Sequence, residues 1–189
     1  MKTALFLDAG YLDKLVSSHY AVASGGRKLP LALDFRKLPE ALAHERPWRV
    51  FYYYCMPYVS DPPLPAEHAA YEAKARFIEF LARQKRWVLR QGVLEKRGEV
   101  LQQKRVDVAL AVDLVRLAWR GEIARAVVLA GDSDFVPAVL DARAAGVKVD
   151  LLYGPQTVHE ELVAACDTAS ILTREALEAV RLPPSGPSA

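Results

Sequence analysis

Two short apolar runs of this chain lead directly into aspartate. Residues 3–7 run into Asp8, and residues 126–130 are followed by Asp132 and Asp134. Runs of this length that end in turn residues are typical of buried strands. Similar runs occur further along the chain, separated by stretches of helical periodicity, at residues 49–54, 87–93 and 147–152. This alternation predicts an α/β fold with a mostly parallel sheet.

The aspartates that follow these runs predict a site at one edge of the sheet. In an open α/β sheet, ligands bind where the carboxyl ends of the strands meet, which is where Asp8, Asp132 and Asp134 are expected. Asp107 falls in the first turn of a helix predicted over residues 105–119 and can reach the same edge. Each aspartate alone has an ordinary role as a helix cap or a turn residue. Four carboxylates at one edge repel one another unless a cation neutralises them, so we predict that these four are metal ligands and catalytic residues.

Magnesium or manganese suits this set of acids, because hard divalent ions prefer oxygen ligands and need only a few carboxylates. The sequence has no His or Cys cluster with the spacing of a metal site, and its four histidines are scattered. Such an ion lowers the pKa of bound water and stabilises charge on a phosphodiester. The expected chemistry is therefore hydrolysis of a phosphate ester.

The middle of the chain carries the positive charge that such a substrate requires. Residues 72–125 contain 13 Lys or Arg against 7 Asp or Glu, although the whole chain has a net charge of only +2. A basic rim around an acidic centre favours a polyanionic partner. We expect phosphate contacts from Lys104 and Arg105, beside Asp107. Further candidates lie on a predicted hairpin tip and in a predicted loop over residues 24–28, namely Lys96, Arg97, Arg27 and Lys28.

Length and composition predict one domain. The 189 residues are 52% hydrophobic, which is enough for a single core over residues 1–181, followed by a disordered tail at 182–189. Charge interrupts every apolar stretch before bilayer length, and residues 3–7 read as a strand rather than a signal segment, so we expect a cytoplasmic protein with no membrane contact. Cys55 and Cys166 lack the spacing of a metal site and are expected to be free thiols. The sequence also allows a homo-oligomer.

Three segments of the chain resemble the NYN-domain proteins of the LabA-like branch, within the PIN-like nuclease group. They are residues 6–12 (FLDAGYL), 104–114 (KRVDVALAVDL) and 130–137 (AGDSDFVP), and their order and spacing agree with the family. A trailing Ala165-Cys-Asp167 resembles the family's closing acidic position. The resemblance implies a Rossmann-like three-layer α/β/α sandwich with an acidic magnesium site and metal-dependent cleavage of RNA.

The resemblance also implies roles for individual residues. Asp8 matches the acid after the first strand, Asp107 the acid that opens the middle helix, and Asp132 with Asp134 the pair after the fourth strand. Tyr11 stands where the family commonly has Asn, an amide that helps to position a phosphate or a metal-bound water. Three residues are expected to support the metal ligands from behind: Asp113, Tyr11 and Ser133. Asp113 lies on the apolar stripe of its helix, where a charge needs a partner, and backbone donors at the floor of the site are one source.

Three functions compete on these residues. The first is a magnesium-dependent or manganese-dependent nuclease acting on RNA, single-stranded in preference, with DNA open as a second substrate. The second is a catalytically silent RNA-binding or scaffold domain, which the departure at Tyr11 favours. The third is a phosphatase of the haloacid dehalogenase type. Those enzymes need two acids separated by one residue after the first strand, whereas Ala9 and Gly10 follow Asp8 here.

Overall fold

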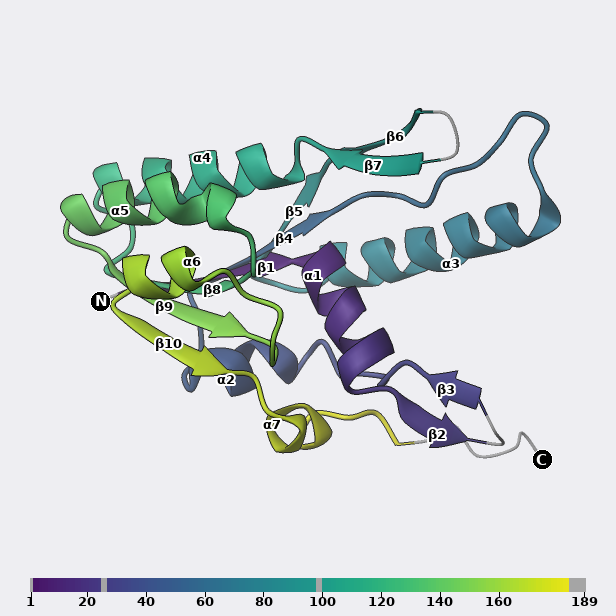
Figure 1. Ribbon diagram of the computed structural model, residues 1–189, viewed down its shortest axis with the longest axis horizontal. Helices are drawn as coiled ribbons and strands as arrows, with labels where there is room; N and C mark the ends of the chain where they lie inside the picture. The colour runs from purple at the N-terminus through teal and green to yellow at the C-terminus, as the bar shows by residue number, and fades with distance from the viewer. Residues whose placement is uncertain (1, 25–26, 98–99, 184–189) are drawn as a thin grey trace.

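Six parallel strands form the central sheet of the computed structural model, in the order β10-β9-β8-β1-β4-β5 (Figure 1). The structure describes residues 2–24, 27–97 and 100–183. All neighbouring strands of this sheet pair in parallel, which confirms the predicted sheet. Its strands are β1 (Thr3–Asp8), β4 (Arg49–Tyr54), β5 (Trp87–Gln91), β8 (Arg125–Leu129), β9 (Lys148–Tyr153) and β10 (Thr168–Ile171).

Helices cover both faces of the sheet and complete a three-layer sandwich (Figure 1). Successive residues of a strand point to opposite faces, so Phe6 and Leu7 of β1 belong to different cores. The core around Phe6 lies under α4 (Val106–Trp119), α5 (Val136–Ala144) and α6 (Glu160–Ala165). The core around Leu7 is closed by α1 (Ala9–Lys14), α2 (Leu38–Ala43), α3 (Pro65–Ala82) and α7 (Arg174–Glu178). The Rossmann-like three-layer fold is confirmed.

Two antiparallel hairpins stand outside the main sheet. The predicted hairpin is confirmed as β6 (Val93–Arg97) paired with β7 (Val100–Lys104), and β5 stops at Gln91 because the chain turns into this arm. The loop predicted over residues 24–28 is wrong, since β2 (Val22–Ser24) pairs there with β3 (Arg27–Leu29). The sixth parallel strand, β10, was not predicted.

Three further expectations concern the C-terminal tail, contact with a membrane and the two cysteines. Residues 184–189 of the expected tail lie outside the described residues. Within the described part, no helix is long and apolar enough to cross a membrane. Cys55 and Cys166 are free thiols, as expected.

Asp113 is a buried acid that ties α4 to the sheet. Its side chain sits on the inner face of α4 and is 4% exposed. Arg90 of β5 donates to its carboxylate through Nε at 2.7 Å and Nη2 at 3.3 Å, Arg116 donates at 2.6 Å, and the Tyr53 hydroxyl donates at 3.2 Å. Burial, and then the charge of Asp113, raise the pKa of Tyr53, so its hydroxyl stays protonated and can donate. Asp113 thus has the predicted structural role, but its hydrogen-bond donors are side chains rather than backbone N–H groups.

The Asp113→Ala substitution should destabilise the protein by about 2–3 kcal/mol, because it leaves two guanidinium groups and a hydroxyl without their shared acceptor. Arg90 and Arg116 are partly exposed, which holds the loss below that of a fully buried pair. Urea unfolding measures the difference. A matched control is Asp141→Ala, which removes one hydrogen bond from Trp119 at an exposed site and should cost less than about 1 kcal/mol. Equal losses in the two variants would contradict this account of Asp113.

Candidate active site

The strand order reverses between β1 and β8, and this reversal places the candidate site. From β1 the chain continues outward to β4 and β5, whereas from β8 it continues in the opposite direction to β9 and β10. The connections that leave the carboxyl ends of β1 and β8 therefore diverge, and a crevice opens between them. Asp8 ends β1, and Gly131 and Asp132 follow β8. The predicted convergence of these two chain segments is confirmed.

An open pocket of about 630 Å³ occupies this crevice. Its walls come from the start of α1, the turn after β8, the β7 strand of the hairpin arm and the loop after β9. The lining residues are Asp8, Gly10, Tyr11, Lys14, Gln103, Gly131, Asp132, Gln156, Thr157, Val158 and His159. A volume of this size is typical of sites for small organic ligands and accommodates a nucleotide.

Asp8 and Asp132 each use one carboxylate oxygen as a helix cap. Oδ1 of Asp8 accepts a hydrogen bond from the backbone N–H of Tyr11 at 3.1 Å, at the start of α1. Oδ1 of Asp132 accepts from the backbone N–H of Asp134 at 3.1 Å, at the start of a short 3₁₀ turn over Ser133–Phe135. The caps fix the direction of both side chains. Each carboxylate can therefore cap a helix with one oxygen and bind a metal ion with the other, so the two roles are compatible.

Electrostatic repulsion links the four acids into one group. Burial is the largest cause that raises the pKa of Asp8 to about 6, and the negative charge of Asp107 adds to this rise. Burial, and then the charges of Asp132 and Asp134, raise the pKa of Asp107. Asp107 thus interacts with Asp8 and with the pair after β8. Among the described residues, no Lys, Arg or His forms an ion pair with any of the four.

The spacing of these acids limits how they could hold a metal ion. Within the part of the chain that the structure describes, no three His, Cys, Asp or Glu side chains come close enough together to form a metal site. A magnesium ion commonly binds to one or two carboxylates and keeps several waters. The residues present fit that mode, since Asp8 and Asp132 face the pocket while the exposed Asp107 and Asp134 flank it. They do not form a closed all-protein cage.

Tyr11 closes the back of the pocket. Its hydroxyl is 2.5 Å from Oγ1 of Thr157 and accepts a hydrogen bond from the backbone N–H of Gly154 at 2.9 Å. Its ring packs over Gly131, where an added Cβ would lie 2.5 Å from the ring and 2.3 Å from the Thr157 carbonyl oxygen. Tyr11 therefore holds the loop after β9 against the first strand, and its hydroxyl is already engaged by these two partners.

The expected nucleic-acid contacts are placed only in part. Lys104 ends β7, and the exposed Arg105 precedes α4 with a left-handed φ of 73°, so both adjoin Asp107. No ion pair within the described residues engages either side chain. The other four candidates lie in the hairpin strands, but their side chains fall outside the described part of the chain: Arg27, Lys28, Lys96 and Arg97.

Most residues of the pocket wall were not predicted, among them Lys14, Gln103, Gln156 and His159. Lys14 is the last residue of α1, six residues after the capping Asp8, and Gln103 pairs with Leu94 across the hairpin arm. Gln156 and His159 lie in the loop after β9. The sequence could have placed this loop at the site, because residues 147–152 were predicted as a strand and its carboxyl end lies at the same edge of the sheet as Asp8 and Asp132.

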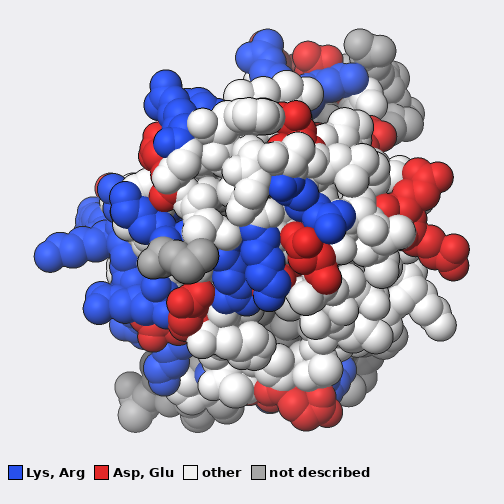
Figure 2. Space-filling model, turned by 90° about the vertical axis from the view of Figure 1, so that its left-hand side faces the viewer, with Lys and Arg blue, Asp and Glu red and all other residues white. Residues whose placement is uncertain are grey.

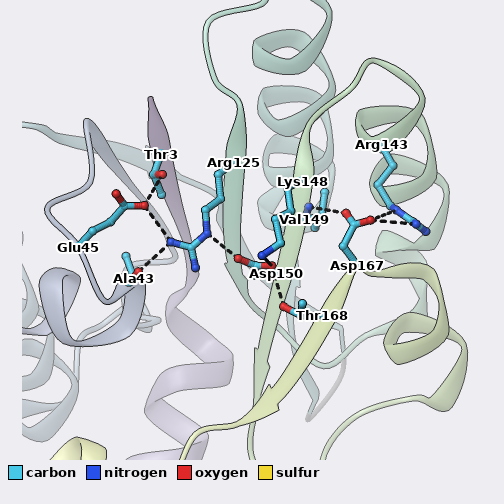
Figure 3. Close-up of polar contacts among 10 residues, drawn as sticks. All are labelled: Thr3, Ala43, Glu45, Arg125, Arg143, Lys148, Val149, Asp150, Asp167 and Thr168. Atoms are coloured by element: carbon cyan, nitrogen blue, oxygen red, sulfur yellow. Dashed lines mark hydrogen bonds and ion pairs between the residues drawn. The ribbon is translucent and has the colours of Figure 1, made fainter. Parts of the chain in front are cut away.

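Asp167, which resembles the family's closing acidic position, lies at the opposite edge of the sheet from the pocket. It precedes β10, and its carboxylate accepts hydrogen bonds from Arg143 Nε at 3.0 Å and from the backbone N–H of Val149 at 2.8 Å (Figure 3). Asp150 at the same edge binds Arg125 at 2.5 Å and Lys148 at 3.1 Å. Figure 2 looks onto this side, where many Lys and Arg side chains gather beside several acids. Basic charge therefore does not gather only around the predicted site.

Comparison with known proteins agrees with the fold and the motifs. The family model described as NYN domain matches residues 2–173, nearly the whole chain, and confirms the resemblance at the level of the family. A crystal structure of a protein of unknown function from Vibrio parahaemolyticus has a TM-score of 0.62 and 14% sequence identity, and the alignment covers 96% of each chain. This likeness supports the fold alone. No curated protein sequence matches the chain significantly.

The raised pKa of Asp8 predicts a pH-dependent gain in stability for Asp8→Asn. The folded protein holds the Asp8 proton more tightly than the unfolded chain, whose pKa is near 3.8, so the wild type gains stability as the pH falls from about 6 toward 4. Asn keeps the helix cap and removes the charge. In EDTA at pH 7 the variant should therefore be more stable by about 1–2 kcal/mol, and this advantage should largely vanish by about pH 4. Urea unfolding at both pH values measures it, and an equal or lower stability of Asp8→Asn at pH 7 would refute the cost of the charge at Asp8.

Proposed function

The chain belongs to the NYN domain family, and on this premise we propose that it hydrolyses phosphodiester bonds of RNA with the help of Mg²⁺ or Mn²⁺. The family lies within the PIN-like nuclease group. The observation that carries the proposal is the group of four aspartates, Asp8, Asp107, Asp132 and Asp134, at the point where the strand order reverses. They repel one another, and within the described residues no basic side chain neutralises them. A group of this kind is costly for folding and is useful for holding a cation.

Asp8 and Asp132 would hold the ion, and Asp107 and Asp134 would add to the negative field that attracts it. A bound divalent ion would supply an activated water and a counter-charge for the phosphate. The acids alone would repel RNA, so cationic side chains must hold its backbone. Lys14 lines the pocket, and Lys104 and Arg105 adjoin Asp107. Contacts of this type orient the strand without reading its sequence.

Single-stranded RNA is the partner that the pocket supports best. The pocket lies between α1, the hairpin arm and the loop after β9, and its size suits a nucleotide of one strand. Sequence-independent binding of a single strand needs a cationic track for the backbone and room for unstacked bases. The preference for RNA over DNA rests on the family, and a cytoplasmic location remains part of the proposal.

A silent RNA-binding domain is the second candidate, and one observation favours it. The acids of the described residues do not close on a common point, and Tyr11 supplies no amide to the site because its side chain is bound to the loop after β9. Such a domain would bind RNA at the same pocket without cleaving it. Binding and cleavage must therefore be measured separately.

The nuclease proposal predicts that Asp132→Asn abolishes RNA cleavage. Loss of a carboxylate that faces the pocket should lower the cleavage rate by about 100-fold or more, because charge stabilisation by a preorganised site accounts for factors of this size. Labelled RNA and p-nitrophenyl phosphate are assayed side by side with Mg²⁺, Mn²⁺ or EDTA. The wild type should cleave RNA only with a metal ion.

The control for this assay is Asp141→Asn, on the exposed face of α5, which should cleave RNA like the wild type. RNA binding without cleavage by the wild type would favour the silent domain. Hydrolysis of p-nitrophenyl phosphate without RNA cleavage would favour a phosphatase. Cleavage that persists in EDTA, or in the purified Asp132→Asn variant, would rule out the proposed role of the acids.

A further inference from the structure

Gln103 presents an amide to the acidic site from an element outside the main sheet. An added Cβ on Gly10 would lie 3.1 Å from both Nε2 and Oε1 of Gln103 and 3.4 Å from Oδ1 of Asp8. The amide of Gln103 and the carboxylate of Asp8 therefore lie within 3.4 Å of one point. Because Gly10 has no side chain, the amide of Gln103 can lie this close to the start of α1 and to Asp8.

This amide has no hydrogen-bond partner among the described residues, although it lines the pocket. Tyr11 also lines the pocket, but its hydroxyl is already bound to Thr157 and Gly154. A neutral donor is well suited to this place, because a Lys or Arg beside Asp8 would form an ion pair and cancel the charge that attracts a cation. An amide can donate to a phosphate oxygen and leave that charge in place.

The base of the hairpin arm is fixed, so Gln103 is held in position. At Gly92, where the chain passes from β5 into the arm, an added Cβ would lie 2.5 Å from Cγ2 of Val106 and 2.6 Å from the carbonyl oxygen of Lys104. The backbone N–H of Gly92 also donates to the carbonyl oxygen of Tyr54 at 2.7 Å. Both ends of the arm are thus packed together against α4. Gln103 lies one residue before this junction.

We propose that Gln103 is a positioning residue of the site, whose amide donates a hydrogen bond to a non-bridging oxygen of the RNA phosphate that lies against Asp8. The inference rests on the proposed function and adds to it a role for the hairpin arm. The arm is then a wall of the RNA site, and its strand β7 carries the contact. Side chains alternate along a strand, so Gln102 points to the other face of β7 and is not part of the pocket.

The neighbouring Gln102 provides a matched control for the test. Binding of a fluorescein-labelled single-stranded RNA is measured by anisotropy in EDTA, and cleavage is measured separately with Mg²⁺. Gln103→Ala should weaken RNA binding and lower kcat/KM by about tenfold, the effect expected of one hydrogen bond to a charged group. Gln102→Ala should change either value by less than about twofold, as expected for a surface residue. Thermal unfolding checks that both variants are folded.

The Gln103→Glu variant separates a hydrogen bond from packing. Glu has the size of Gln but carries a negative charge toward the phosphate, so RNA binding in EDTA should fall further than in Gln103→Ala. If packing alone mattered, Gln103→Glu would bind like the wild type, and that result would overturn the inference. Equal effects of Gln103→Ala and Gln102→Ala would also overturn it. A wild type that binds no RNA would instead defeat the proposed function, and the inference with it.

Discussion

The parallel pairing of β1 with β8 decides where the rest of the site lies. These two strands are neighbours in the sheet although more than a hundred residues separate them in the chain, and their register aligns Leu7 with Leu129. Asp8 and the turn that begins at Ala130 therefore emerge together. Because the chain leaves the two strands in opposite directions, a pocket opens between the segments that follow them. The pocket and the positions of Asp8 and Asp132 follow from this one junction.

The two edges of the sheet handle buried charge differently. At the edge where the strands begin, the acids are neutralised: Arg125 binds Asp150 and Glu45, and Arg143 binds Asp167 (Figure 3). At the edge where the strands end, burial and then the charge of Asp107 raise the pKa of Asp8, and no ion pair within the described residues offsets them. Ion pairs at the first edge stabilise the fold. Unpaired acids at the second edge reduce stability, as is common at functional sites.

Much of this architecture could be predicted because it depends on local patterns. The five strands that were predicted are apolar runs bounded by charge or turn residues. The strand β10 was missed because it spans only Thr168–Ile171 and shows no apolar alternation. The hairpin of β2 and β3 was missed because its strands are three residues each, flanking glycines that favour a loop.

Some features of the site could also be predicted from the sequence, and others could not. The acids were predictable since each follows an apolar run or opens a helix. The direction of Tyr11, the partners of Asp113 and the position of Gln103 were not, because each depends on residues that are distant in the sequence and meet only after the sheet has formed. The sequence motif of Asp167 likewise does not reveal that this residue precedes its strand rather than following it.

A crystal of the protein soaked in Mn²⁺ tests the central claim most directly. The account predicts an anomalous density peak at the carboxyl edge between β1 and β8, about 2.2 Å from a carboxylate oxygen of Asp8 or Asp132, with water completing the coordination. A map without such a peak, in which Asp8 and Asp132 bind only the backbone N–H groups of their own helix caps, would contradict it.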